Sequence, residues 1–68
     1  MSLQISLKAA RVNVGMTQED VAIVLKRNKQ TIVNWENGIT KISIEDFKKL
    51  ADLYEVPIEN LKIPDRRK

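Results

Sequence analysis

Residues 17–38, TQEDVAIVLKRNKQTIVNWENG, decide how this chain folds. They read as two short helices joined by a tight turn, and the second helix begins at a capping Asn28. The outer face of this second helix is formed by Lys29, Gln30, Val33 and Asn34. A small domain has little reason to place amides and a lysine along one helical face unless that face contacts something polar. In a basic chain the leading candidate is the major groove of DNA.

Caps and apolar stripes divide the rest of the chain into three further helices and no strand. A first helix starts near Ser6 and ends at Gly15, and Thr17 caps the second. Ser43 caps a fourth helix over SIEDFKKLADLYE, and Pro57 opens a short fifth one. The expected inward-facing positions are Leu7, Ala10, Val14, Val21, Ala22, Leu25, Ile32, Trp35, Phe47, Leu50, Ala51 and Tyr54, and the last helix carries Ile58 and Leu61. The pattern predicts an all-α fold of five helices.

The composition is that of one small globular domain. The chain has 68 residues, 43% of them hydrophobic and 31% charged, so we expect a single domain over residues 1–64 and a basic tail, residues 65–68, that frays. No apolar run approaches the roughly 20 residues of a membrane span. The absence of cysteine excludes disulfides and suits a reducing compartment. We therefore expect a cytoplasmic protein without membrane contact.

The net charge of +3 is unevenly distributed. Residues 1–41 contain six basic and three acidic residues, whereas residues 42–68 contain six of each. The positive excess therefore lies in the half that contains the two central helices. A charge of +3 is also ordinary for a small domain, so charge alone leaves nucleic-acid binding and simple solubility open.

The chemistry of the polar face suits base recognition. Gln30 and Asn34 carry amides that can pair with adenine N6 and N7, and Lys29 can bond guanine O6 and N7. The methyl groups of Val33 can pack on the thymine methyl group. Periodicity by itself equally allows a solvated helix face.

One set of residues, spread over most of the chain, carries a family resemblance. These residues are Gly15, Thr17-Gln18-Glu19, Val21-Ala22, Leu25, Ile32, Trp35-Glu36-Asn37-Gly38, Ser43, Leu50-Ala51 and Val56-Pro57. In type and spacing they resemble the Cro/C1-type (XRE) helix-turn-helix family over about residues 7–61. The resemblance implies a compact, five-helix, lambda-repressor-like DNA-binding domain whose second and third helices form the helix-turn-helix.

The resemblance also implies contacts with the DNA backbone. Gln18 matches a residue that binds a phosphate at the start of the second helix, where the helix dipole favours an anion. Asn37 and Lys41 match positions that meet the backbone of the same half-site. Lys29, Gln30, Val33 and Asn34 occupy the base-reading places. Solvated side chains at Gln18 and Lys41 are the alternatives.

Two further positions take structural roles by the same resemblance. Arg11 and Glu36 match a partly buried ion pair that joins the first and third helices, although a phosphate-binding Arg11 is the alternative. Trp35 continues the stripe of Ile32, which favours a core residue over a base-stacking one.

The turn between the two central helices departs from the family pattern. Lys26 stands where the family usually has a glycine in a left-handed conformation, and Arg27 stands where it usually has an apolar residue. A reshaped turn is therefore expected, because a left-handed conformation costs lysine about 1–2 kcal/mol. The two charges point either to phosphate contact, for which Arg27 is the candidate, or to solvation.

Apolar residues at positions that are usually polar suggest protein contacts. Ile23 and Val24 are such residues in the second helix, and Ile39 is one after the third. The candidates for a dimer contact are Ile39, Ile58, Leu61 and Ile63. For Ile58 and Leu61, closing the core is the alternative.

The leading hypothesis for function is a transcriptional regulator of phage, mobile-element or small bacterial Cro-like type. It would bind a pseudo-palindromic double-stranded operator as a homodimer and act by occluding or contacting RNA polymerase. The alternative is an antitoxin or another interaction module that also binds DNA and docks a partner on Ile23 and Val24. An enzyme is not expected, because the chain has no His, no Cys and only two glycines, and no metal or cofactor site is evident.

Overall fold

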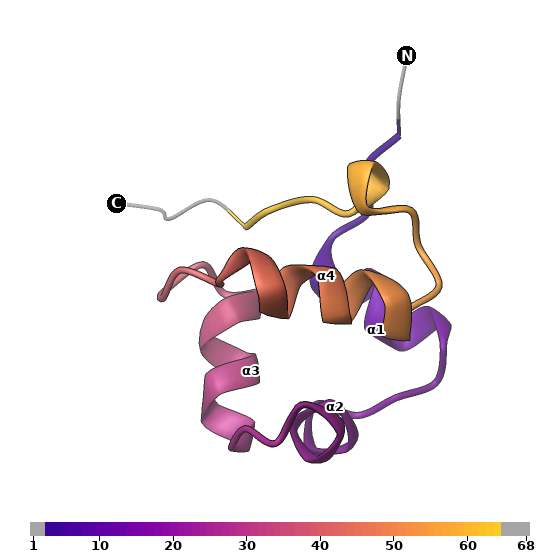
Figure 1. The fold of residues 1–68 in the computed structure, drawn as a ribbon. Helices are drawn as coiled ribbons and strands as arrows, with labels where there is room; N and C mark the ends of the chain where they lie inside the picture. The colour runs from indigo at the N-terminus through magenta and orange to yellow at the C-terminus, as the bar shows by residue number, and fades with distance from the viewer. Residues whose placement is uncertain (1–2, 65–68) are drawn as a thin grey trace.

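The computed structural model describes residues 3–64, which form four α-helices and one 3-10 turn (Figure 1). The elements are α1 (Leu7–Asn13), α2 (Gln18–Leu25), α3 (Lys29–Glu36), α4 (Ile44–Leu53) and η1 (Ile58–Asn60). The predicted all-α fold is confirmed. The expected frayed tail, residues 65–68, lies outside the described residues.

The expected fifth helix is wrong, because η1 is a single 3-10 turn of three residues. The chain becomes extended at Leu61, where it runs beside Ile5. The Ile5 N–H donates to the Asn60 carbonyl at 2.8 Å, and the Lys62 N–H donates to the Ile5 carbonyl at 2.8 Å. A helix that continued through Leu61 would break both hydrogen bonds. This pairing is an isolated parallel bridge and fastens the two ends of the described chain together.

Each α-helix begins at a side chain that caps its first turn. Ser6, Thr17, Asn28 and Ser43 each accept a hydrogen bond from the backbone N–H three residues later, at 2.9–3.1 Å. Such bonds satisfy donors that the helix itself leaves unpaired. At α2 the bond is reciprocal, because the carboxylate of Asp20 accepts the Thr17 N–H at 2.9 Å. The caps predicted from the sequence therefore set where all four helices start.

Each α-helix also ends in the same way, at a residue with positive φ. These residues are Gly15 (φ 74°), Lys26 (φ 58°), Gly38 (φ 70°) and Glu55 (φ 59°). The N–H of each following residue donates back to the carbonyl five positions earlier, which is the Schellman pattern: Met16 to Arg11, Arg27 to Ala22, Ile39 to Asn34 and Val56 to Ala51. The turn after α2 is thus not reshaped, because Lys26 adopts the left-handed conformation usual for glycine.

The core lies where the four helices meet. It consists of Leu7, Ala10, Val21, Ala22, Leu25, Ile32, Trp35, Phe47, Leu50, Ala51, Tyr54 and Leu61. Val14, which the apolar stripe of the first helix predicts to face inward, is half-buried and packs against this core. No helix within residues 3–64 has the length and apolar character that crossing a membrane requires.

Candidate nucleic-acid interface

Helix α3 stands at one edge of the molecule, with α2 packed against it and α4 lying across its end (Figure 1). Its inner stripe, Ile32 and Trp35, is buried in the core. Its opposite face carries the four predicted base-reading residues: Lys29 and Gln30 are exposed, and Val33 and Asn34 are half-buried. The burial of one stripe therefore determines which side chains α3 presents to the outside.

The two amides of this outer face are joined to each other. Gln30 Nε2 donates to Asn34 Oδ1 at 2.9 Å, one helical turn apart. The pairing aligns the two side chains along α3, and each amide keeps a further donor or acceptor for a base edge. Their spacing, four positions on one helix, is the spacing at which such amide pairs form.

The end of α3 is fastened by a buried polar cluster around Glu36. The Arg11 guanidinium donates from Nε to Glu36 Oε2 at 2.7 Å and from Nη2 to Oε1 at 3.3 Å. Arg11 Nη1 also donates to the Met16 carbonyl at 2.9 Å. The hydrogen bond to Glu36 raises the pKa of Arg11 above its ordinary value, so the guanidinium keeps its charge in this site. The structure thus places both residues in a link between α1 and α3.

Gln18, the predicted phosphate anchor, belongs to the same cluster. Its Nε2 donates to Glu36 Oε1 at 3.0 Å, which ties the first residue of α2 to the last of α3. The side chain is half-buried and retains an amide oxygen and one N–H. The structure therefore shows a positioning contact for Gln18 that the sequence did not reveal, and phosphate contact stays a prediction.

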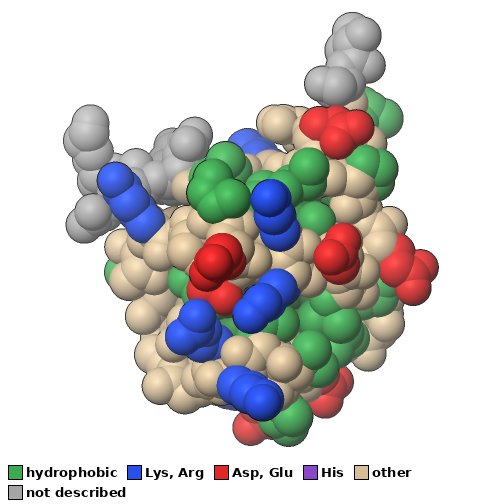
Figure 2. Space-filling view, in the orientation of Figure 1, with side chains coloured by type: hydrophobic (Ala, Val, Ile, Leu, Met, Phe, Trp, Pro, Cys, Tyr) green, Lys and Arg blue, Asp and Glu red, His purple; other side chains and the backbone are tan. Residues whose placement is uncertain are grey.

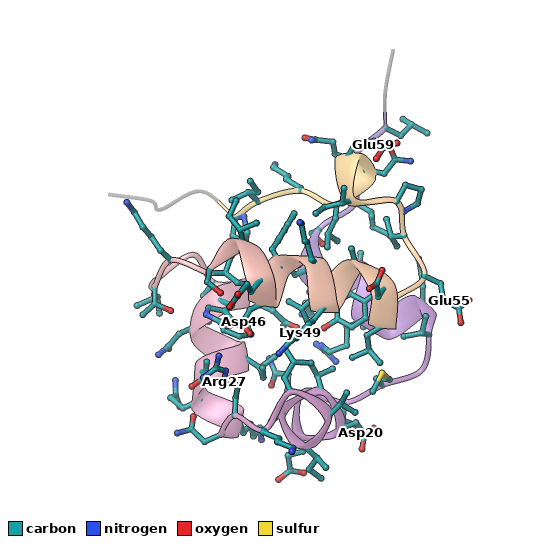
Figure 3. All side chains as sticks on the ribbon, viewed as in Figure 1. Asp20, Arg27, Asp46, Lys49, Glu55 and Glu59 are labelled. Carbon is teal, nitrogen blue, oxygen red and sulfur yellow. The ribbon has the colours of Figure 1, made fainter. Side chains whose placement is uncertain are left out.

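The start of α3 is fastened by a second ion pair, between Arg27 and Asp46. Arg27 Nη2 donates to both carboxylate oxygens, at 2.9 and 3.2 Å. Figure 3 shows the two side chains pointing toward each other, from the turn before α3 and the first turn of α4. The expectations for Arg27 were phosphate contact or solvation, and neither included this partner. The two residues lie 19 positions apart, and no local signal relates them.

Basic side chains gather on the face that carries this turn (Figure 2). Lys26 and Arg27 lie in the turn, and Lys49 extends from α4 beside them. Acidic side chains lie between the basic ones (Figure 2), so the face is positive only in patches. Asn37 and Lys41, the remaining phosphate candidates, are exposed just after α3.

The dimer candidates divide into exposed and buried residues. Ile39, Ile58 and Ile63 are exposed. Leu61 is 2% exposed and packs in the core, which fits the alternative that it closes the core. Ile44, which is not among these candidates, is 71% exposed at the start of α4 and lines a surface groove with Ile58 and Ile63.

Within residues 3–64, no group of three acidic side chains is arranged to hold a metal ion. Comparison with family models gives a match to a helix-turn-helix family over residues 7–61. The comparisons with curated proteins and with solved structures gave no match. The matched range runs from the first residue of α1 to the core residue that follows η1, and α2 and α3 form the helix-turn-helix within it. The chain therefore belongs to the Cro/C1-type (XRE-like) helix-turn-helix family and is a DNA-binding domain of regulatory type.

Proposed function

We propose that this protein is a sequence-specific transcriptional regulator that reads double-stranded DNA with the outer face of α3. One observation carries the proposal: a helix whose inner stripe is buried presents two amides, a lysine and a valine side by side at the edge of the molecule. Polar groups with this spacing match the donor and acceptor pattern of the major groove. Each well-made pair contributes about 1–3 kcal/mol of discrimination between bases.

The two fastenings of α3 support this function. Arg11 and Gln18 donate hydrogen bonds to Glu36, the last residue of α3. The Arg27–Asp46 ion pair ties the turn before α3 to α4. A reading helix held at both ends has a defined orientation before it meets DNA, and it loses less conformational entropy on binding.

We assign contacts with the DNA backbone to four residues, Gln18, Arg27, Asn37 and Lys41. They lie around α3: at the start of α2, in the turn before α3, and just after its end. Contacts from such positions fix the register of a reading helix without distinguishing bases.

The regulator acts as a homodimer on a pseudo-palindromic operator. Two recognition helices about 34–36 Å apart would enter successive major grooves. The surface for the two-fold contact is the groove that contains Ile44, Ile58 and Ile63, because exposed apolar side chains cluster there. Ile39, which is exposed after α3, is a further candidate for this contact. Occupying the operator in the cytoplasm would exclude or contact RNA polymerase.

The test begins with selection of bound duplexes from a random DNA pool, which yields the operator and its symmetry. Gln30→Ala should then weaken operator binding by about tenfold or more while leaving random-sequence binding nearly unchanged, because base contacts are lost. Lys41→Ala should weaken both and reduce the salt slope by about one. Equal losses on both DNAs for Gln30→Ala would remove it from the reading face. Failure to select any sequence would contradict the function.

A second candidate is an interaction module of antitoxin type that also binds DNA. Ile23 is 75% exposed and Val24 is 54% exposed, next to each other on α2. Exposed neighbouring apolar residues mark contact surfaces. Co-purification of a small partner protein, abolished by Ile23→Ser with Val24→Ser while DNA binding persists, would support this role. Unchanged recovery of the partner with the double variant would contradict it.

A further inference from the structure

Arg27 is an exception among the residues that close the four helices. The residue after each left-handed position is apolar at Met16, Ile39 and Val56. In this motif the position normally makes an apolar contact back onto its own helix. Arg27 keeps the backbone bond to Ala22, at 2.9 Å, but sends its guanidinium away to α4.

The contact with Asp46 occupies only one edge of that guanidinium. Both hydrogen bonds run from the same nitrogen, Nη2. Within residues 3–64, Nη1 and Nε of Arg27 make no hydrogen bond, and 47% of the side chain is exposed. The guanidinium therefore has one edge held by the protein and another edge open to an acceptor.

Asp46 is held in place by its burial and by the cap of α4. Its side chain is 7% exposed, and its backbone N–H is bonded to Ser43 in the cap of α4. A buried carboxylate needs a cation to offset its lost hydration. Lys49 lies one turn further along α4 in the same region (Figure 3), but Arg27 is the ion-pair partner of Asp46 among the described residues. The carboxylate thus fixes Arg27, and α4 fixes the carboxylate.

We propose that Asp46 is a positioning residue, which holds Arg27 beside the start of α3 so that the free edge of its guanidinium binds the DNA backbone. The inference rests on the proposed DNA-binding function. A planar guanidinium that is already oriented loses less side-chain entropy when it meets a phosphate. The ion pair thus serves binding even though Asp46 itself carries a charge that DNA repels.

Asp46 should weaken DNA binding through its negative charge and strengthen it by positioning Arg27, and these opposite effects make the proposal testable. Affinity for a random duplex of about 20 base pairs is measured over a salt series, since phosphate contacts require no operator. Arg27→Gln should weaken binding about three- to tenfold and reduce the salt slope by about one. Asp46→Asn should also weaken binding, although it removes a negative charge. Asp46→Asn should add no further loss in the Arg27→Gln background.

Asp52→Asn is the matched control, because Asp52 is an exposed acid on the same helix. It should leave affinity unchanged or slightly tighter. Urea unfolding is measured for every variant, and binding is compared at a temperature at which all of them are folded. Arg27→Lys is a second variant that leaves the buried carboxylate with a cation: it should keep the salt slope and weaken binding about two- to threefold, because lysine lacks the planar fork.

Each contrary result has a distinct meaning. Tighter binding by Asp46→Asn, matching Asp52→Asn, would show that Asp46 merely repels DNA and would overturn the proposal. An unchanged salt slope in Arg27→Gln, or unchanged affinity in Arg27→Lys, would also overturn it while leaving the proposed function intact. Absence of duplex binding by the unaltered protein would instead contradict the proposed function itself.

Discussion

At the scale of single residues, one lysine and one glutamate carry backbone strain that glycine would relieve. Lys26 and Glu55 have φ values of 58° and 59°, in the left-handed region. Their counterparts after α1 and α3 are Gly15 and Gly38. The hydrogen bonds of the Schellman pattern form in all four cases, so the helix ends impose the conformation whichever residue is present.

Lys26→Gly should raise the free energy of unfolding by about 0.5–1 kcal/mol. Relief of about 1–2 kcal/mol of left-handed strain exceeds the added backbone freedom of glycine in the unfolded chain, which costs about 0.4–1 kcal/mol. Urea unfolding measures the change. Lys48→Gly is the control: Lys48 is exposed within α4, where glycine should destabilise by about 1 kcal/mol. Equal destabilisation by both substitutions would refute the strain at Lys26.

Tyr54 gives the protein a pH dependence at the alkaline end. Burial, and next the charge of Glu36, raise the pKa of Tyr54 from 10.0 to about 12. Between these values the folded protein keeps a proton that the unfolded chain releases, so stability should fall as pH rises from 10 to 12. The fall should amount to at most about 2 kcal/mol. Unfolding free energies of wild type and Tyr54→Phe from pH 9 to 12 measure it, and identical pH profiles would contradict it.

At the scale of the elements, each helix is bounded by local hydrogen bonds at both ends. The caps join residues three positions apart, and the Schellman bonds join residues five apart. Helices of 7–10 residues are too short to be stable alone in water. The caps therefore define the boundaries, whereas burial of the apolar stripes provides the stability.

Ser43→Ala should lower the free energy of unfolding by about 1 kcal/mol, because the Asp46 N–H loses its acceptor at the start of α4. Ser43→Asn restores an acceptor at the same place and should recover most of that loss. Thermal or urea unfolding distinguishes the two variants. If alanine and asparagine proved equally stable, the cap would make no measurable contribution.

At the scale of the whole molecule, the exposed apolar groove around Ile44, Ile58 and Ile63 is lined by no residue of α3. The groove lies between the start of α4 and the segment after it that contains η1, so in the proposed dimer α3 would stay free to enter DNA while the groove pairs with a second copy. Separate surfaces would allow the proposed contacts with DNA and with a second copy to form together.

Ile44→Glu combined with Ile63→Glu should weaken dimerisation by about tenfold or more, since two charges would enter an apolar contact. Both side chains are exposed, at 71% and 62%, so folding should be unaffected. Sedimentation equilibrium, alone and with operator DNA, measures the association. Ile23→Glu on α2 is the control and should leave it unchanged. A wild-type protein that stays monomeric even on its operator would exclude this dimer.

Local chemistry explains why much of the fold was predictable. The four caps, the glycine stops and the inner stripe of α3 depend on residues within about five positions of each other, so residue types alone indicate them. The same periodicity placed Lys29, Gln30, Val33 and Asn34 on one outer face. The prediction of a fifth helix was wrong because Leu61 pairs with Ile5, which is far away in the sequence.

The sequence by itself therefore determined the four α-helices, the caps at which they start and the residues that face outward on α3. Only the tertiary structure decided which distant groups meet. Gln18 reaches Glu36 across 18 positions, Arg27 reaches Asp46 across 19, and Leu61 belongs to the core rather than to the surface. Such contacts depend on how the helices pack, and helix packing is a property of the assembled core rather than of any short segment.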